Sequence, residues 1–549
     1  MRLLVPLLAA ALCLPRPAAA QHEGHGSRGP GGSGVPAAAL GSVAFRNAGA
    51  PAAQEPFQRG VALLHSFEYD DAAAAFREAQ RADPRLAAAY WLEALTYSHV
   101  MWGEEDLPAA RAALARLAPT PEARLARAAD ARERAFGAAV EAFFADGAPP
   151  ARVRAYADSL RRLAAADPAD LEAASFAAHG LLAAAMSAPP AERPGMAREA
   201  EALARRAFAA NPRHPGAAHY LIHVVDVDAS DPARSLDAAR AYDRIAPDAE
   251  HALHMPSHVF LPLGMWAEVA ASNERAWAAS RAWAARGGRT PVEVSWHSFD
   301  WLQYAYLQQG RWRESRAFVD SAVAIMRGVE VPDRAPDARY AVIDVAFRHA
   351  SETGRWDAWP AGTADARRIL DDPQPTARAR MMATAAAYQA AAAALHARGD
   401  TAPAAAVARR FAAAADSLAP DAPRRATLRG LAAQLGAAVA ARRGDRAGAI
   451  ALLQAVADAE AANASFPPGV DPLHEQLGGL LLEAGRPAEA AAAFERSLAG
   501  RPNRSAALLG LARARAAAGD AAGATEAAAR LRANWRRADP QVLALAPAR

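Results

Sequence analysis

The sequence predicts an all-α fold in which antiparallel helix pairs stack into a solenoid. Three observations support this prediction. Alanine makes up roughly three residues in ten, far above average usage, and it is the strongest helix former. Small residues, aromatic residues and prolines recur with spacings typical of a repeat architecture. Glycines recur where the two helices of each pair would be joined, and such tight turns favour glycine.

The composition excludes several classes of protein. The chain has 549 residues, more than one hydrophobic core usually supports. Its single cysteine excludes a disulfide framework and any site built from several thiolates. A formal charge of +3 argues against a dedicated nucleic-acid binder. The sequence contains no Walker loop, no G-x-S-x-G and no H-E-x-x-H, so it assigns no catalytic residue.

Residues 1–20 have the pattern of a cleaved secretory signal peptide. Arg2 precedes an apolar run that is too short to span a bilayer, and Ala18–Ala20 offer small residues for cleavage after Ala20. Residues 21–52 then predict a flexible leader rich in glycine and proline. No later run is apolar enough for a transmembrane helix. We therefore expect an exported protein, periplasmic or secreted.

The first helix pair shows the spacing that defines the repeat. Gly60, Ala72, Phe76, Ala79 and Pro84 stand at the offsets of the tetratricopeptide (TPR) pattern when the repeat starts at residue 53. The small residues let the two helices approach closely, and the aromatic ring fills the space between them. The proline stops the second helix.

The same pattern recurs along the rest of the chain. Glycines predict the turn inside each later pair at Gly264, Gly310, Gly354, Gly399, Gly444, Gly485 and Gly519. With two prolines that end helices, they place repeats starting near residues 171, 215, 250, 296, 340, 385, 430, 471 and 505. We divide the solenoid into N-terminal repeats (53–165), central histidine-rich repeats (166–330) and C-terminal repeats (331–549). Residues 104–165 are helical by composition, but their repeats cannot be phased.

The phasing assigns an environment to the histidines. In a TPR the first helix of each pair lines the concave groove. His219 and His223 take two groove-facing positions of one repeat, and His254 and His258 take the same positions of the next. Each pair is spaced i,i+4 and so shares one helix face. The other residues predicted to line the groove are His65, His99, His179, His251, His297 and Tyr304.

This arrangement predicts a metal site. Side chains of neighbouring helices, roughly 8–10 Å apart, can reach one another, and imidazole suits Zn, Cu, Ni or Fe. The predicted ligands of a divalent transition metal are His219, His223, His254, His258 and Asp300, with Asp226 as a weaker candidate. Pro256 lies between His254 and His258, so we expect the helix to be interrupted there.

Two other interpretations of these histidines stay open. They can be core residues that hydrogen-bond to one another and to the backbone. They can also line a groove for a peptide, a protein or a small anionic ligand, as polar residues do in peptide-binding TPRs. By analogy with most TPR solenoids, the first functional hypothesis is an interaction scaffold with an unknown peptide or protein partner. The alternative is a metalloprotein, including a metal-dependent enzyme.

Several strings resemble those of an exported bacterial TPR family. They include Ala218-His-Tyr-Leu-Ile-His223, His251-Ala-Leu-His-Met-Pro-Ser-His258 and Leu64-His-Ser-Phe-Glu-Tyr-Asp70. The resemblance extends over about residues 55–530. It implies a TPR fold and brings no established reaction, cofactor or substrate. The segment Thr96-Tyr-Ser-His-Val100 departs from the Asn-His-Pro that the family pattern leads one to expect.

Overall fold

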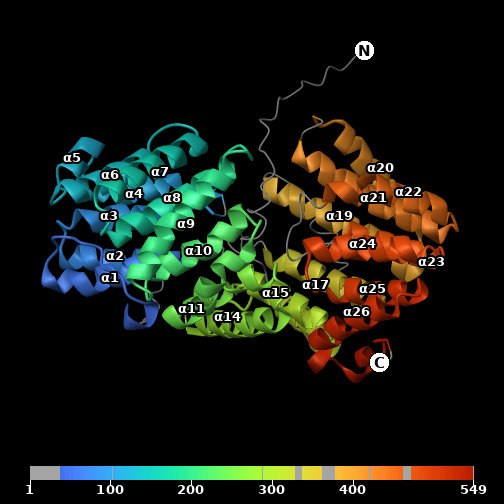
Figure 1. Cartoon of the computed structure of the whole chain (residues 1–549). Coiled ribbons are helices and arrows are strands. Elements are labelled where there is room, and N and C mark those ends of the chain that lie inside the picture. Colours follow the sequence, from blue (N-terminus) through green and yellow to red (C-terminus); the bar gives the residue numbers. More distant parts are fainter. Residues whose placement is uncertain are drawn as a thin grey trace, which may run out of the picture.

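The computed structural model is predominantly helical in the residues that it describes. It describes residues 37–101, 103–286, 289–327, 337–361, 377–419, 422–460 and 472–547. Successive helices pack as antiparallel neighbours (Figure 1). This arrangement agrees with the predicted α-solenoid. The signal peptide predicted at residues 1–20 lies outside the described residues.

The N-terminal helices begin after a short 3-10 helix, Ala37–Leu40. They are α1 (Pro51–His65), α2 (Tyr69–Ala82), α3 (Ala87–Leu95), α4 (Leu107–Leu117), α5 (Pro121–Leu125), α6 (Ala131–Phe143) and α7 (Pro149–Ala166). A small antiparallel hairpin of β1 (Ser98–His99) and β2 (Glu104–Glu105) separates α3 from α4. This hairpin interrupts the helical repeat at the start of the region, residues 104–165, that the sequence did not phase.

The central helices carry most of the predicted site. They are α8 (Leu171–Ser187), α9 (Arg193–Ala210), α10 (Pro215–Val227), α11 (Leu236–Ile245), α12 (Glu250–His254), α13 (Ser257–Phe260), α14 (Trp266–Arg286), α15 (Trp296–Gln308), α16 (Trp312–Met326) and α17 (Asp337–Thr353). Short 3-10 helices occupy Pro232–Ser235 and Trp356–Ala361.

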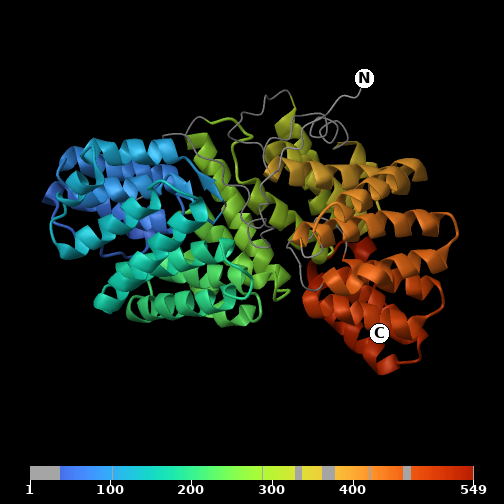
Figure 2. The same cartoon turned by 90° about the horizontal axis from the view of Figure 1, so that it is seen from above.

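The C-terminal helices form a second array beside the first (Figure 2). They are α19 (Ala377–Arg398), α20 (Thr401–Asp416), α21 (Pro423–Arg442), α22 (Arg446–Glu460), α23 (Leu473–Glu483), α24 (Pro487–Gly500), α25 (Ser505–Ala517), α26 (Ala521–Asn534) and α27 (Pro540–Leu543), with a 3-10 turn at Trp535–Arg537. No helix in the described part of the chain combines the length and the apolar character needed to cross a bilayer.

The turns and the close helix contacts follow the predicted phasing. All seven predicted turn glycines have positive φ, in the left-handed region that glycine adopts readily. In the first repeat, a Cβ built on Gly60 would lie 2.6 Å from the ring of Phe76. The small residue of α1 and the aromatic residue of α2 therefore meet as the repeat pattern requires.

The apolar core is continuous across the N-terminal and the central repeats. It extends from Leu40 to Ala346, so these two groups of repeats share one core. The later part of the predicted leader also belongs to this core, because Phe45 is 1% exposed and packs edge-on against the rings of Phe57 and Phe136. Glycine and proline content alone could not reveal that this segment has a buried aromatic anchor.

Two long-range contacts fold the solenoid back on itself. The end of α1 packs against α10, although about 150 residues separate them. The turn before α25 docks on the central helices, where the Trp266 indole N–H donates to the Asn503 carbonyl at 2.8 Å. The buried Arg504 guanidinium reaches Tyr304, Glu352 and Glu475. These contacts position the histidines in an interior rather than along an open groove.

Candidate metal centre

Six histidines from α10, α12, α13 and α15 gather in two adjacent groups. Within each group, three ligand nitrogens lie within 4.8 Å of one another. The first histidine group is His219, His223 and His251, and the second is His254, His258 and His297. All six side chains are buried, with exposed fractions of 7% or less. The four histidines that the sequence predicted as ligands are thus divided evenly between the two groups.

The first histidine group is formed where α10 faces α12. His219 and His223 stand on the same face of α10, and His251 approaches from α12 with its Nε2 3.0 Å from the Nε2 of His219. The Nδ1–H of His219 donates to the carbonyl oxygen of His65 at 2.6 Å. A carbonyl only accepts hydrogen bonds, so the proton of His219 sits on Nδ1 and its Nε2 presents a lone pair.

The second histidine group spans the predicted helix break. The helix is interrupted around Pro256, between α12 and α13. His254 and His258 nevertheless converge, with their Nε2 atoms 3.0 Å apart. The Nδ1–H of His254 donates to Asn273 Oδ1 at 2.6 Å, and the Asn273 amide is oriented because its Nδ2 donates to the Val269 carbonyl at 2.8 Å. His254 therefore also presents the lone pair of Nε2.

Asp226 joins the two groups. Its Oδ2 accepts from His223 Nδ1 at 2.7 Å, and its Oδ1 accepts from His258 Nδ1 at 3.0 Å. The carboxylate is 2% exposed and binds one histidine of each group. Hydrogen bonds of this kind fix the tautomer and the ring orientation of metal-binding histidines. The sequence had ranked Asp226 as a weak ligand, whereas its position makes it an orienting group.

The arrangement suits a divalent transition metal. Adjacent nitrogen ligands at usual metal–nitrogen distances are about 3.0–3.4 Å apart, and the two Nε2–Nε2 pairs have this separation. The indole of Trp301 stacks on His258 with the ring centroids 4.7 Å apart and also contacts His254 and His297. This aromatic wall excludes water from the second histidine group, which strengthens electrostatic interactions there.

A third cluster near the site is a hydrogen-bond network. The Glu172 carboxylate lies 2.9 Å from His65 Nε2 and 3.3 Å from His214 Nε2. His214 Nδ1 accepts from the Ala217 N–H at 3.2 Å, so its proton is on Nε2 and points to the carboxylate. Burial opposes ionisation of Glu172, but the two histidines hold its pKa well below the usual range. Burial lowers the pKa of His65. The sequence analysis did not identify Glu172 or His214.

Asp300 does not reach the histidines. It follows His297 by three residues, which turns it about 60° around the axis of α15, and it forms an ion pair with Arg348 of α17. Burial raises its pKa to about 7, although Arg348 acts in the opposite direction. The predicted ligand set is therefore corrected at this position. His297, one turn earlier, supplies the side chain that faces His254, with the ring centroids 4.5 Å apart.

The remaining predicted groove residues have different surroundings. His179 lies on α8 between the rings of Phe67 and Tyr220. His99 belongs to β1, because α3 ends at Leu95, and it stacks on Tyr69 at 4.1 Å. Tyr304 is buried and accepts a hydrogen bond from Arg504. These residues do not line one continuous open groove.

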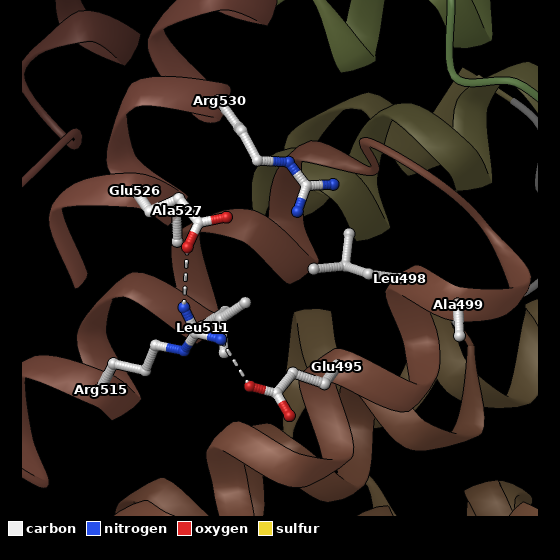
Figure 3. Close-up of a pocket in the computed structure, with 8 residues that line it drawn as sticks. All are labelled: Glu495, Leu498, Ala499, Leu511, Arg515, Glu526, Ala527 and Arg530. Atoms are coloured by element: carbon white, nitrogen blue, oxygen red, sulfur yellow. Dashed lines mark hydrogen bonds and ion pairs between the residues drawn. The ribbon is translucent and has the colours of Figure 1, made fainter. Parts of the chain in front are cut away.

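A pocket in the C-terminal repeats lies far along the chain from the histidines. Helices α24, α25 and α26 line it with Leu498, Leu511, Ala499, Ala527 and four charged side chains (Figure 3). Arg515 donates to Glu495 at 2.7 Å and lies 3.6 Å from Glu526, and Arg530 stands on the opposite side. The wall of this pocket combines both charges with a small apolar floor.

Comparisons with known proteins identify the repeat. Residues 481–546 match the tetratricopeptide repeat family. No curated protein matches the sequence significantly. Among known structures, the human IFIT1 dimer with m7Gppp-AAAA is similar, with 11% identity over 90% of this chain and 91% of that chain and a TM-score of 0.35. The Cut9–Hcn1 complex of APC/C shares 13% identity over 86% and 78% of the two chains, with a TM-score of 0.31.

At these TM-scores the likeness to either structure carries no further argument. The helix pairs, their glycine turns and the family match at residues 481–546 agree with one another. The chain is an α-solenoid of tetratricopeptide-type helix pairs.

Proposed function

We propose that this protein is a metalloprotein that binds a divalent transition metal in each of its two histidine groups. One observation carries the proposal. The Nδ1–H groups of His219, His223, His254 and His258 all donate to oxygen acceptors. This pattern leaves the Nε2 atoms as ligands. A nitrogen-rich donor set of this kind suits Zn, Cu, Ni or Fe.

The pair His254 and His258 gives the strongest support. With both protons on Nδ1, two Nε2 lone pairs face each other at 3.0 Å in a buried site. The two lone pairs repel each other, whereas a cation bound between them attracts both. The alternative interpretation, in which the histidines only form hydrogen bonds, fits the third cluster well. There Glu172 lies between His65 and His214 and accepts from both.

Metal analysis of the purified protein tests the proposal. After loading with Zn²⁺ and removal of the excess, the full chain is expected to retain two metal ions. His219→Gln and His254→Gln each should remove one ion. His349→Gln is the matched control, because His349 is also buried but its ring bonds Ser315 and belongs to neither histidine group. Circular dichroism verifies folding. Equal metal content in all variants, or none in the wild type, would refute the proposal.

A second proposed role is partner binding by the C-terminal repeats, and the pocket in Figure 3 favours it. Because the histidine groups are buried, a peptide does not have direct access to them. The pocket between α24 and α26 offers both charges and an apolar floor to an extended segment. A peptide that is selected from a library for binding to the wild-type protein should not bind the Arg530→Glu variant. Unchanged binding would exclude this pocket.

We further propose that the protein acts outside the cytoplasm after cleavage behind Ala20. The apolar run after Arg2 and the small residues at Ala18–Ala20 support this location. Amino-terminal sequencing of the protein recovered from its native host tests it. A mature chain that starts at Gln21 is expected, and a chain that retains Arg2 would contradict it.

A further inference from the structure

A narrow cavity lies directly beside the first histidine group. Helices α1, α6, α7 and α8 supply half of its lining residues, namely Leu64, Phe143, Tyr156, Phe176 and His179. Ser98 of β1 covers one side, so the small hairpin forms part of the wall. The space admits about one water-sized molecule.

The chemistry of the wall selects a neutral ligand. The side chains that line the cavity in the described part of the chain are apolar, aromatic or uncharged, without a carboxylate or a guanidinium group. Burial lowers the pKa of His179 to about 3 and raises the pKa of Tyr156, so neither side chain is charged near neutral pH. An ion would lose its hydration here without gaining a counter-charge.

Two buried polar atoms of the wall have no intramolecular hydrogen bond. Among the described residues, neither the Tyr156 hydroxyl nor His179 Nε2 has a partner. Tyr156 is 1% exposed. Buried polar groups are usually satisfied, and exceptions in a cavity point to a missing ligand or water. A small molecule with one hydrogen-bonding atom would satisfy one of them.

Phe67 separates this cavity from the first histidine group. Its ring lines the cavity and lies 5.6 Å from the ring of His179. The centroid of the same ring is 4.4 Å from that of His219 and 5.3 Å from that of His251. The φ angle of Phe67 is +56°, a left-handed conformation that costs free energy for a bulky residue. Such strain is typical of residues at functional sites.

We propose that this cavity binds a neutral molecule of diatomic size, of the class of dioxygen or nitric oxide, and that Phe67 gates its passage to the metal in the first histidine group. The binding part stands on the cavity itself. The gating part rests on the proposed metal site. Displacement of the Phe67 ring connects the cavity with His219 and His251.

Xenon binding tests the cavity independently of any metal. Xenon occupies apolar protein cavities. Crystals of the metal-free full chain under xenon pressure are expected to show an anomalous peak between Tyr156 and Phe176. Ser98→Phe fills the cavity from the hairpin and should abolish this peak. Absence of xenon from the wild type would overturn the cavity proposal, and a peak that persists in Ser98→Phe would place xenon elsewhere and also overturn it.

Nitric oxide binding tests the gate. The chain is loaded with Fe²⁺ under anaerobic conditions, and formation of the iron–nitrosyl species is followed by stopped-flow absorption and electron paramagnetic resonance. Phe67→Ala is expected to raise the association rate at least tenfold, with Phe67→Leu giving a smaller increase and Ser98→Phe a decrease. Iron content should stay that of the wild type. Equal rates in all variants would overturn the gate.

The two proposals fail in different ways. If the chain takes up no iron, the gate is overturned, whereas the Zn²⁺ measurement decides the metal site and the xenon result decides the cavity. If iron binds but the Phe67 variants react with nitric oxide like the wild type, only the gate is wrong.

Discussion

Asp226 connects His223 and His258 through its two carboxylate oxygens, at 2.7 and 3.0 Å. The two histidines belong to different helices, α10 and α13, and to different histidine groups. One buried carboxylate therefore sets the ring orientation in both groups. Because both groups depend on the same carboxylate, their ring geometries are coupled.

Replacement of Asp226 by asparagine should weaken metal binding while it leaves the side-chain volume almost unchanged. Asparagine keeps the shape but has one acceptor oxygen, so it satisfies only one of the two Nδ1–H donors. Loss of such an orienting partner typically costs about 10–100-fold in metal affinity. Competition titration against a chromophoric chelator measures this loss for Asp226→Asn. Asp237→Asn is the control, because Asp237 is an exposed carboxylate paired with Arg205, and unchanged affinity in both variants would contradict the orienting role.

Gly216 allows α10 to approach the end of α1. A Cβ at this position would lie 2.4 Å from Nδ1 of His65, and the carbonyl of His65 orients His219. Gly216→Ala should therefore lower the free energy of unfolding by about 1–3 kcal/mol, as overpacking does, and also reduce metal affinity. Urea unfolding followed by tryptophan fluorescence measures the first effect. Gly479→Ala on α23 meets no atom within 4 Å and should instead be neutral or stabilising.

The stability of the chain should depend on the ionisation of His349. Burial, assisted by Arg316, lowers its pKa to about 4. As pH falls below the ordinary value of 6.5, the unfolded chain takes up a proton that the folded chain does not, so folding stability decreases. Between pH 6.5 and pH 5 the loss amounts to about 2 kcal/mol. His349→Gln removes this component, and unfolding curves of the two proteins with the same pH dependence would contradict the assignment.

Arg504 should control the docking of the C-terminal repeats. Burial opposes its charge, but Glu352 and Glu475 raise its pKa well above the ordinary value. Arg504→Met removes the guanidinium that pairs these two half-buried carboxylates, and loss of one partner of a fully buried pair costs up to about 3–5 kcal/mol. We expect the variant to show a larger radius of gyration in small-angle scattering. Adding Glu352→Gln and Glu475→Gln to Arg504→Met should restore much of the compact form. An Arg504→Met variant with the radius of gyration of the wild type would refute this role.

The repeat geometry could be predicted from the sequence because it is local. Gly310 and Gly485 have the positive φ that their turn positions require, and Gly60 meets Phe76 within one helix pair. The i,i+4 spacing placed His219 and His223 on one face of α10, and the same spacing brings His254 and His258 together across the helix break. These properties depend on residues fewer than 34 positions apart.

The composition of the site could not be predicted because it depends on distant segments. The turn at Phe67 fills the concave side of α10, more than 150 residues away. Glu172 and His214 joined the network through tertiary packing alone. Asp300 was misplaced because it follows His297 by three residues, which turns it about 60° around the axis of α15 and directs it toward Arg348 of α17 instead of the histidines.

The most direct test of the central claim is X-ray absorption at the metal edge of the loaded full chain. We expect a first shell of nitrogen and oxygen ligands at about 2.0–2.1 Å, with outer-shell scattering from at least three imidazole rings per metal ion. A shell of oxygen ligands alone, without imidazole scattering, would contradict a metal centre formed by the two histidine groups.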